Sequence, residues 1–389
     1  MKTATKRAAG PTAALLAVFL LFFLALRYSA QVRQGLSDAV ALCASVMVPS
    51  LFPMLILSAF AAACPCPAWL QRLSAQPLRA LFGLSPGCAA PLLLGLTGGY
   101  PLAARSASAA RREGLISAED ARRLTLCFTC PGLPFTVVAV GEGFYRSKAI
   151  GLTLFAACAA ADLLTAALYR LIAAKPTANT ETASHTAPAG NADTAAHVKL
   201  TGNAGAALPP TAGPIAARLV GAVEQSIRSM LSVCAWIGAF YAVMGMVSAL
   251  PLGQTARYLS LFAEVTGAVN EAAGMKNVPL TAFCLAFGGV CVFCQLLPDI
   301  GAHRVGAIRF LAARLLCGGL AYLIETALLQ CFSLPVPTQT RLGTLYLSAD
   351  TAAGSAALLF LCAVFMAETA RPRAGIPPGG RRRKKQTSE

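Results

Sequence analysis

The stretch Thr97-Gly98-Gly99-Tyr100-Pro101 decides the fold, because it places glycine and proline inside an apolar segment. Three further interruptions follow it: Cys130-Pro131-Gly132-Leu133-Pro134, Thr266-Gly267 and Gly288-Gly289. In lipid, an interrupted helix leaves backbone N–H and C=O groups without partners, which is costly. Such breaks persist where the freed groups line a polar cavity or hold a solute, and paired breaks in two halves of a membrane chain indicate a solute site.

The composition places these breaks in a membrane protein. The chain has 389 residues, of which 56% are hydrophobic and 12% are charged, and its mean hydropathy is +0.63. Soluble domains carry about 25% charged residues. The long Ala, Leu and Phe runs lack the period-two alternation of membrane β-strands. We therefore expect an all-α polytopic membrane protein.

The net charge of +16 is concentrated near the chain ends. The basic residues there are Lys2, Lys6, Arg7, Arg371, Arg373, Arg381, Arg382, Arg383, Lys384 and Lys385. Because positive residues beside spans set topology, we expect both termini in the cytoplasm and an even number of spans. A basic tail also attracts anionic lipid. Membrane lipids are therefore expected partners, whereas nucleic acid is not, since no basic face is interleaved with aromatic residues.

The order of apolar segments and breaks divides the chain into six parts. These are residues 1–35, a basic head with a first span; 36–174, a first repeat; 175–213, a linker; 214–335, a second repeat; 336–370, a final span; and 371–389, a basic cytoplasmic tail. The linker has almost no large apolar residue, so we expect it to be disordered. Breaks in matching order predict two pseudo-symmetric repeats of inverted topology, with about eight spans in all.

Local signals outline the helices beside the breaks. Two prolines fall inside the apolar segment Ser37–Cys64, which predicts a helix that is kinked or split there. Ser117 is followed by two acidic residues, which is typical of a helix start. In the second half, we expect an amphipathic segment at Ala216–Ser229 that leads into a span at Met230–Leu250.

Ionisable and amide side chains in membrane segments are candidates for function, because they are costly to bury. Glu264 lies two residues before the Thr266-Gly267 break, and Asn270 lies a turn beyond it. Glu264 could bind a coupling cation, carry a proton or hydrogen-bond a solute; alternatively, it caps a helix or pairs with an arginine such as Arg314. Gln295 could present its amide to the same cavity or bond a neighbouring helix. Asp162, Asp299 and Glu325 are expected near interfaces or as pairing partners.

The breaks themselves supply binding groups. A half-helix N-terminus concentrates N–H donors and positive dipole, which suits a carboxylate or phosphate. The candidate substrate-binding residues are Thr97, Gly98, Gly99, Tyr100, Pro101, Thr129, Pro134, Glu264, Thr266, Gly267, Asn270, Gly288, Gly289 and Gln295. The alternative is that each break is a kink whose backbone groups are satisfied by neighbouring helices.

Two C-x-x-C pairs also lie at breaks, Cys127 with Cys130 and Cys291 with Cys294. This spacing can hold zinc or cycle as a dithiol. However, cysteines here mostly occupy apolar runs, where they behave as small hydrophobes. Nucleophile-elbow, metalloprotease and phosphate-loop motifs do not occur in the sequence. We expect no enzymatic activity, no cofactor and no metal.

A longer motif surrounds the first break. The segment Gly98–Arg105 (GGYPLAAR) with the downstream Gly114–Leu124 (GLISAEDARRL) resembles the sporulation integral membrane protein family of the YlbJ type, which carries the nucleoside-recognition or Gate domain. Segments that agree in the second half are Phe262–Gly267, Phe287–Gly289, Gln295 and Ala313–Leu315. The resemblance covers about residues 36–335, apart from the linker.

This resemblance implies a fold similar to concentrative nucleoside transporters, with hairpin-like broken helices. It also implies a role in spore formation, at the outer forespore membrane derived from the mother cell, where the family is associated with moving dipicolinic acid. Positions that are polar in the family are Cys130, Gly132, Leu133, Cys291 and Phe293 here. Fewer groups therefore remain to coordinate sodium. A proton-coupled or a passive mechanism is thus as well supported as a sodium-coupled one.

The expected function is transport of a small anionic metabolite, dipicolinate first, by alternating access between the two repeats, with a proton or sodium as the coupling ion. A nucleoside or another organic solute is the alternative within transport. A non-transporting membrane scaffold for spore morphogenesis is the alternative outside it.

Overall fold

The computed structural model describes residues 2–64, 68–173 and 214–332. Regular structure in these ranges is helical throughout, and they contain no strand. The expected linker, final span and basic tail lie outside the described residues, so those expectations stay predictions.

Five helices in the described ranges are long and apolar enough to cross a membrane, which makes this an integral membrane protein. They are Ser29–Ala61, Lys148–Ile172, Ile215–Ser248, Val278–Ala302 and Ala307–Phe332. The pair Gln71–Phe82 and Pro86–Gly98, which is bent by 104°, is a broken span or a re-entrant loop. The described part thus holds five spans, or six if the bent pair is one. Because the expected final span lies outside the described residues, the total of about eight for the whole chain stays a prediction.

The first half begins with a long helix that changes its winding. Its elements are α1 (Lys2–Arg27), α2 (Ser29–Leu42), the π-helical turn η1 (Cys43–Met47) and α3 (Val48–Ala62). The run Ser29–Ala61 still counts as one span, so the prolines do not split it. The π-helical turn ends two residues before Pro49, and such turns are common where a helix bends.

A helical hairpin follows at the first break. The elements are α4 (Ala68–Pro77), η2 (Leu78–Phe82), η3 (Pro86–Cys88), α5 (Ala89–Gly98) and α6 (Tyr100–Arg112). Between α5 and α6 the chain turns at Gly99, whose φ of 82° lies in the region that favours glycine. The two helices then pack against each other, so Thr97–Pro101 forms the tip of a hairpin.

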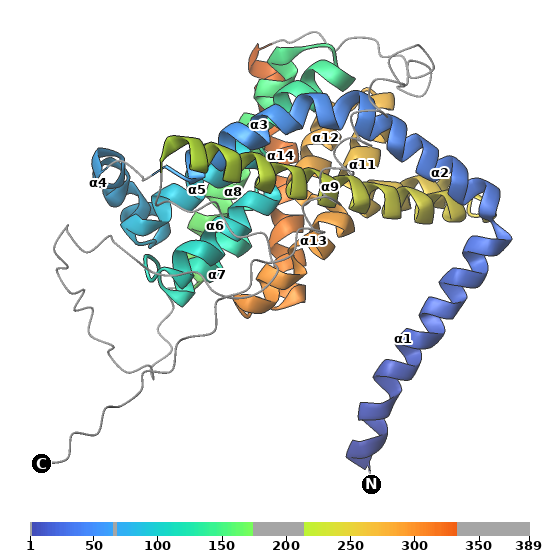
Figure 1. Ribbon diagram of the computed structural model, residues 1–389. Coiled ribbons are helices and arrows are strands. Elements are labelled where there is room, and N and C mark those ends of the chain that lie inside the picture. Colours follow the sequence, from blue (N-terminus) through green and yellow to red (C-terminus); the bar gives the residue numbers. More distant parts are fainter. Residues whose placement is uncertain (1, 65–67, 174–213, 333–389) are drawn as a thin grey trace, which may run out of the picture.

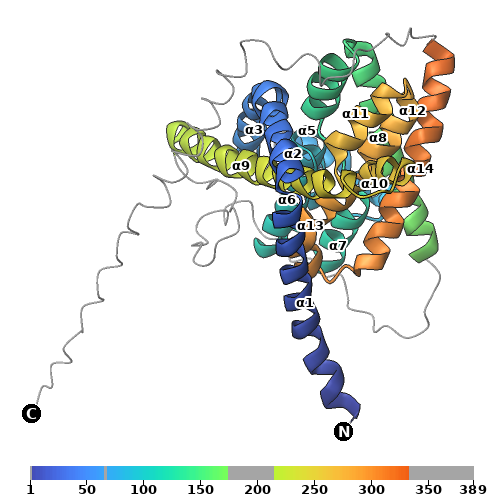
Figure 2. The same ribbon diagram turned by 90° about the vertical axis from the view of Figure 1, so that its right-hand side faces the viewer.

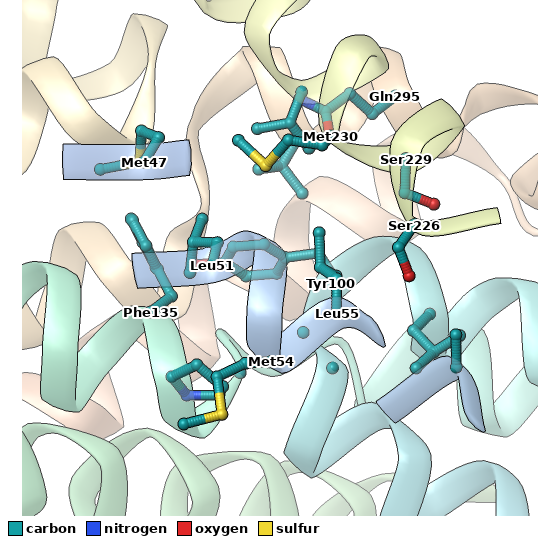
Figure 3. Close-up of a pocket in the computed structure, with 18 of the residues that line it drawn as sticks. Met47, Leu51, Met54, Leu55, Tyr100, Phe135, Ser226, Ser229, Met230 and Gln295 are labelled. Atoms are coloured by element: carbon teal, nitrogen blue, oxygen red, sulfur yellow. The ribbon is translucent and has the colours of Figure 1, made fainter. Parts of the chain in front are cut away.

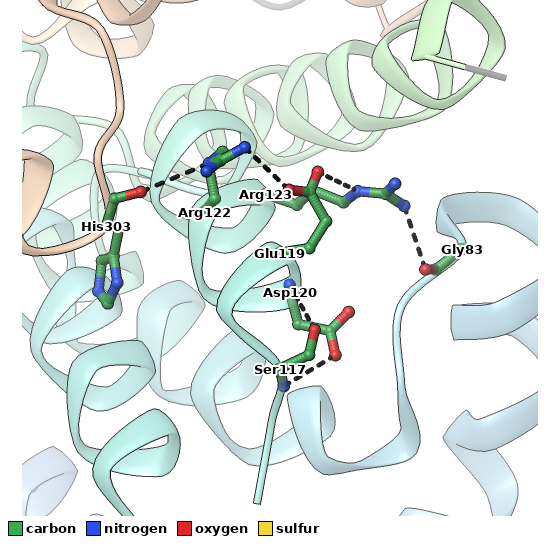
Figure 4. Close-up of polar contacts among 7 residues, drawn as sticks. All are labelled: Gly83, Ser117, Glu119, Asp120, Arg122, Arg123 and His303. Carbon is green, nitrogen blue, oxygen red and sulfur yellow. Dashed lines mark hydrogen bonds and ion pairs between the residues drawn. The ribbon is translucent and has the colours of Figure 1, made fainter. Parts of the chain in front are cut away.

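The helix after this hairpin starts as the sequence predicts. In α7 (Ala118–Cys127), Ser117 and Asp120 form a capping box, each side chain bonding the other's backbone N–H. Figure 4 shows this cap, together with a chain of contacts in which Glu119 joins Arg122 and Arg123. After α7 come the second break, the π-helix η4 (Phe135–Phe144) and α8 (Lys148–Ala173).

The second half begins with a single helix, α9 (Ile215–Ser248), of 34 residues. The expected amphipathic segment Ala216–Ser229 and the expected span Met230–Leu250 thus lie on one continuous helix, which ends at Ser248. The remaining elements are α10 (Gln254–Ala263), α11 (Val265–Gly274), α12 (Val278–Phe287), α13 (Gly289–Ala302) and α14 (Ala307–Phe332).

The two halves pack together along two helix pairs. The α2–α3 run lies beside α9, and α8 lies beside α14. In both views α9 lies crosswise to α14 (Figure 1; Figure 2). The broken helices of each half are held between these pairs, which positions the site described next.

Candidate functional site

A cavity of about 100 Å³ lies where the helix breaks come together. Its lining includes Thr97–Tyr100 from the first break, Gly132 and Pro134 from the second, and Glu264–Thr266 from the third. Val292 and Gln295 line it from α13, just after the fourth break. Figure 3 shows the ring of Tyr100 in the middle of the view, between Met230 and Met54.

Its volume limits what the cavity holds in this conformation. A buried water needs roughly 10–15 Å³ by this measure, and an engineered apolar cavity of about 150 Å³ admits benzene. At about 100 Å³, the cavity has room for several waters and is smaller than that benzene site. A larger solute requires the walls to move apart.

Direct backbone contacts pair the breaks within each half. A Cβ added at Gly132 would lie 2.7 Å from the backbone N of Gly99, closer than real Cβ contacts. In the second half, a Cβ at Gly289 would lie 3.1 Å from the carbonyl oxygen of Ala263, next to the third break. Both contacts need glycine, so the glycines of the breaks serve close packing of one break on another.

Glu264 caps α11 from within the third break. Its backbone is extended, and its carboxylate accepts bonds from the N–H of Gly267 at 2.7 Å and from Oγ1 of Thr266 at 2.8 Å. The side chain is 3% exposed and lines the cavity. The capping interpretation of Glu264 is therefore confirmed, and pairing with Arg314 is not observed.

Arg314 instead forms a buried ion pair with Asp162, at 3.0 Å between Nη1 and Oδ1, with side chains 2% and 1% exposed. This confirms the prediction of Asp162 as a pairing partner. Arg314 also donates to the carbonyl oxygen of Ala286, while the hydroxyl of Tyr100 donates to that of Leu285. Both carbonyls belong to the last turn of α12, which the fourth break leaves without intrahelical partners.

The N-termini of the other half-helices carry no such cap. The N-cap residue of α6, η4 or α13 makes no side-chain hydrogen bond, in contrast to Glu264 at α11. Of these three helices, α6 and η4 begin at residues that line the cavity, Tyr100 and Pro134–Phe135. Their positive dipole ends therefore lie at the cavity wall, although the N–H groups of Leu102, Ala103 and Thr136 bond backbone carbonyls of the breaks.

Eight of the candidate residues line the cavity: Thr97, Gly98, Gly99, Tyr100, Pro134, Glu264, Thr266 and Gln295. The cavity lining does not include Pro101, Thr129, Gly267, Asn270, Gly288 or Gly289. Thr129 is buried and bonds the carbonyl oxygen of Thr125 at 2.8 Å, within its own helix end. The N–H of Gly267 donates to the carboxylate of Glu264. Gly288 and Gly289 both have a positive φ and form the turn between α12 and α13.

Several lining residues escape the sequence prediction. Arg105 on α6 lines the cavity and donates to Oγ of Ser229 on α9 at 3.0 Å. Gln225 and Ser226 line it one turn earlier on α9, and the buried Oε1 of Gln225 has no hydrogen-bond partner in the described residues. Arg105 stands in a small-residue helix one turn after a break, and the three α9 residues share one helix face. The sequence alone, however, does not show that these two helix faces meet.

The opposite wall is apolar. It includes Met47, Leu51, Met54 and Leu55 from the η1–α3 run, and Met230 from α9. Among the lining residues, Arg105 is the only cation and Glu264 the only acid. Glu264 caps the N-terminus of α11. The positive potential in the cavity therefore comes from Arg105 and from the N-termini of α6 and η4.

A second polar cluster joins the halves beyond the cavity. Oγ of Ser108 on α6 donates to Oδ1 of Asp299 at 2.6 Å and lies 2.8 Å from Nε2 of His303 at the end of α13. Nδ1 of His303 accepts from Arg111 at 3.2 Å, and Arg122 bonds the His303 carbonyl oxygen (Figure 4). Burial lowers the pKa of His303, helped by neighbouring arginines and opposed by Asp299.

The cysteine pairs hold free thiols. Cys127, Cys130 and Cys291 are buried, and Cys294 is half-buried. Within the described ranges, no three His, Cys, Asp or Glu residues are grouped so that they could hold a metal ion.

Comparisons of the chain with protein-family models, with curated proteins and with solved structures gave no match. The resemblance to the sporulation family therefore stays a prediction from the sequence motifs.

Proposed function

We propose that this protein transports a small organic anion across the membrane, through the cavity where the four helix breaks meet. The observation that carries the proposal is that convergence: breaks from both halves line or adjoin one cavity. Irregular backbone at membrane depth is tolerated where it is buried in protein or lines a cavity. Broken helices meeting at the interface of two halves are the usual construction of a transport site.

The order of elements supports two related repeats. In the first half, the α5–α6 hairpin contacts the break between α7 and η4; in the second, the α10–α11 turn contacts the break between α12 and α13. A long helix closes each half, α8 or α14, and these two pack together. We propose that the duplicated unit consists of a hairpin, a broken helix and a closing helix, in this order.

The lining supports an anion with an apolar body. Arg105 and the uncapped ends of α6 and η4 favour a carboxylate. The methionine and leucine wall suits a ring. An aromatic carboxylate fits this description, and the motif resemblance makes dipicolinate the first solute to test.

The size of the cavity is compatible with alternating access. At about 100 Å³ it is smaller than a cavity that admits benzene, so we propose that this conformation is one in which the site is closed. The wall most suited to move is the apolar one on α3 and α9, because methionine side chains adapt to repacking.

The test is uptake by the full chain in proteoliposomes, with and without an imposed proton or sodium gradient. We expect dipicolinate and benzoate to enter faster than uridine. Arg105→Gln should raise the KM for carboxylates by about tenfold or more, since a charge-assisted bond is worth ~1.5–3 kcal/mol. Arg112→Gln, an exposed arginine on the same helix, should leave uptake unchanged. Equal effects of the two variants would contradict the assignment of Arg105.

One observation favours a second function, a membrane scaffold without transport. The carbonyls of α12 and the N-terminus of α11 are satisfied by Tyr100, Arg314 and Glu264, so these breaks do not need a ligand. A scaffold admits none of the three solutes under either gradient.

A further inference from the structure

A buried acid outside the cavity has no ion-pair partner among the described residues. Glu325 on α14 is 0% exposed, inside the span Ala307–Phe332. Its Oε1 lies 2.8 Å from Oγ1 of Thr153 on α8, and its Oε2 has no hydrogen-bond partner within the described ranges. The same two helices hold Asp162, which differs because Arg314 pairs with it.

The hydrogens at Thr153 indicate the state of this acid. Oγ1 of Thr153 also lies 3.0 Å from the carbonyl oxygen of Ile150. A hydroxyl has one hydrogen to donate, so it cannot serve both oxygens. If the acid were ionised, either the carboxylate or the Ile150 carbonyl would lose this bond. A neutral acid solves the conflict: its O–H donates to Thr153, and Thr153 donates to Ile150.

The titratable groups that interact with Glu325 in the described part of the chain supply no positive charge. They include Tyr145, at the end of η4, and Cys158 on α8. Tyr145 bonds Oγ1 of Thr281 on α12 at 2.5 Å, and α12 carries no charged residue.

The basic residues of α8 and α14 are engaged or distant. Lys148, at the start of α8, pairs with Glu142 at 3.0 Å, and Arg314 pairs with Asp162. Arg309 on α14 lies about 24 Å from Glu325 along the helix, at ~1.5 Å per residue. Arg170 lies at a similar distance from Thr153 on α8, about 26 Å.

We propose that Glu325 is a proton-binding site within the membrane, occupied at neutral pH in this conformation. The ligand is a single proton, held as the O–H bond of a neutral carboxylic acid. Release breaks that bond and passes the proton to water, which reaches Glu325 only when α8 and α14 separate. This site stands independently of the proposed transport function, because its argument uses only the α8–α14 contact.

Infrared spectroscopy of the purified full chain at neutral pH tests the proposal. A protonated carboxyl group gives a carbonyl stretch separate from that of a carboxylate. We expect Glu325→Gln to remove one such band and Glu113→Gln, an exposed acid, to leave all of them. Because glutamine mimics the neutral acid, the variant should fold.

A second variant keeps the test decisive if Glu325→Gln does not fold. Thr153→Val removes the acceptor of the proposed O–H bond and should shift the same band, whereas Thr326→Val, whose hydroxyl bonds only its own helix, should not. A spectrum unchanged by both the Glu325 and Thr153 variants overturns the proposal.

Discussion

The buried pair of Arg314 and Asp162 gives the sharpest stability prediction. Arg314→Met leaves the Asp162 carboxylate, 1% exposed, without a cation. Removing one partner of a buried pair costs about 3–5 kcal/mol, because the remaining charge stays buried. The change also deprives the carbonyl of Ala286 of its donor. We expect the single variant to be destabilised by at least this amount.

The double variant Asp162→Leu with Arg314→Met separates the two roles of the arginine. Replacing a buried pair by apolar residues is often close to neutral. Here the Ala286 carbonyl would still lack its donor, at about 1–3 kcal/mol. The double variant should therefore recover most of the loss while remaining less stable than the original protein by about 1–3 kcal/mol.

Unfolding in mixed micelles with increasing SDS measures these differences. The matched control is Glu142→Leu with Lys148→Met, since that pair is exposed, with side chains 40% and 75% accessible. Its loss should stay below about 1 kcal/mol. Full recovery in the Asp162–Arg314 double variant would show that the broken end of α12 does not depend on Arg314.

Three further predictions concern the breaks and the contact between halves. Gly132→Ala forces a Cβ to within 2.7 Å of the Gly99 backbone, so it should destabilise by about 1–3 kcal/mol in the same unfolding measurement; no loss would contradict the contact. Glu264→Ala removes the α11 cap and should cost about 0.5–2 kcal/mol, whereas Glu264→Gln, which keeps an acceptor, should cost less; equal losses would argue against capping. For His303 the folded pKa is lowered, so the unfolded chain binds the proton first and the melting temperature should fall as pH drops below about 6.5; His303→Gln should flatten this dependence, and an unchanged slope would refute it.

Features set by neighbouring residues were predictable from the sequence. The Ser117 cap forms as expected because its partner, Asp120, is three residues away. Glu264 likewise caps the helix that starts directly after it. The break at Gly99 forms because glycine tolerates the positive φ that the hairpin requires.

Features set by tertiary packing were not predictable in the same way. Arg314 was considered as a partner for Glu264, but its actual partner, Asp162, is brought to it only by the packing of α8 on α14. Arg105 was missed as a site residue because the sequence does not show which face of α6 meets α9.

The most direct test of a shared solute site at the four breaks is to fill the cavity and measure flux. Ser229→Trp places a large ring against Arg105 in the cavity lining, whereas Val220→Trp places one on an outward face of the same helix, where the side chain is 57% exposed. We predict that carboxylate uptake into proteoliposomes is lost in Ser229→Trp and retained in Val220→Trp. Equal uptake by both variants, with both folded, would contradict a solute path through this cavity.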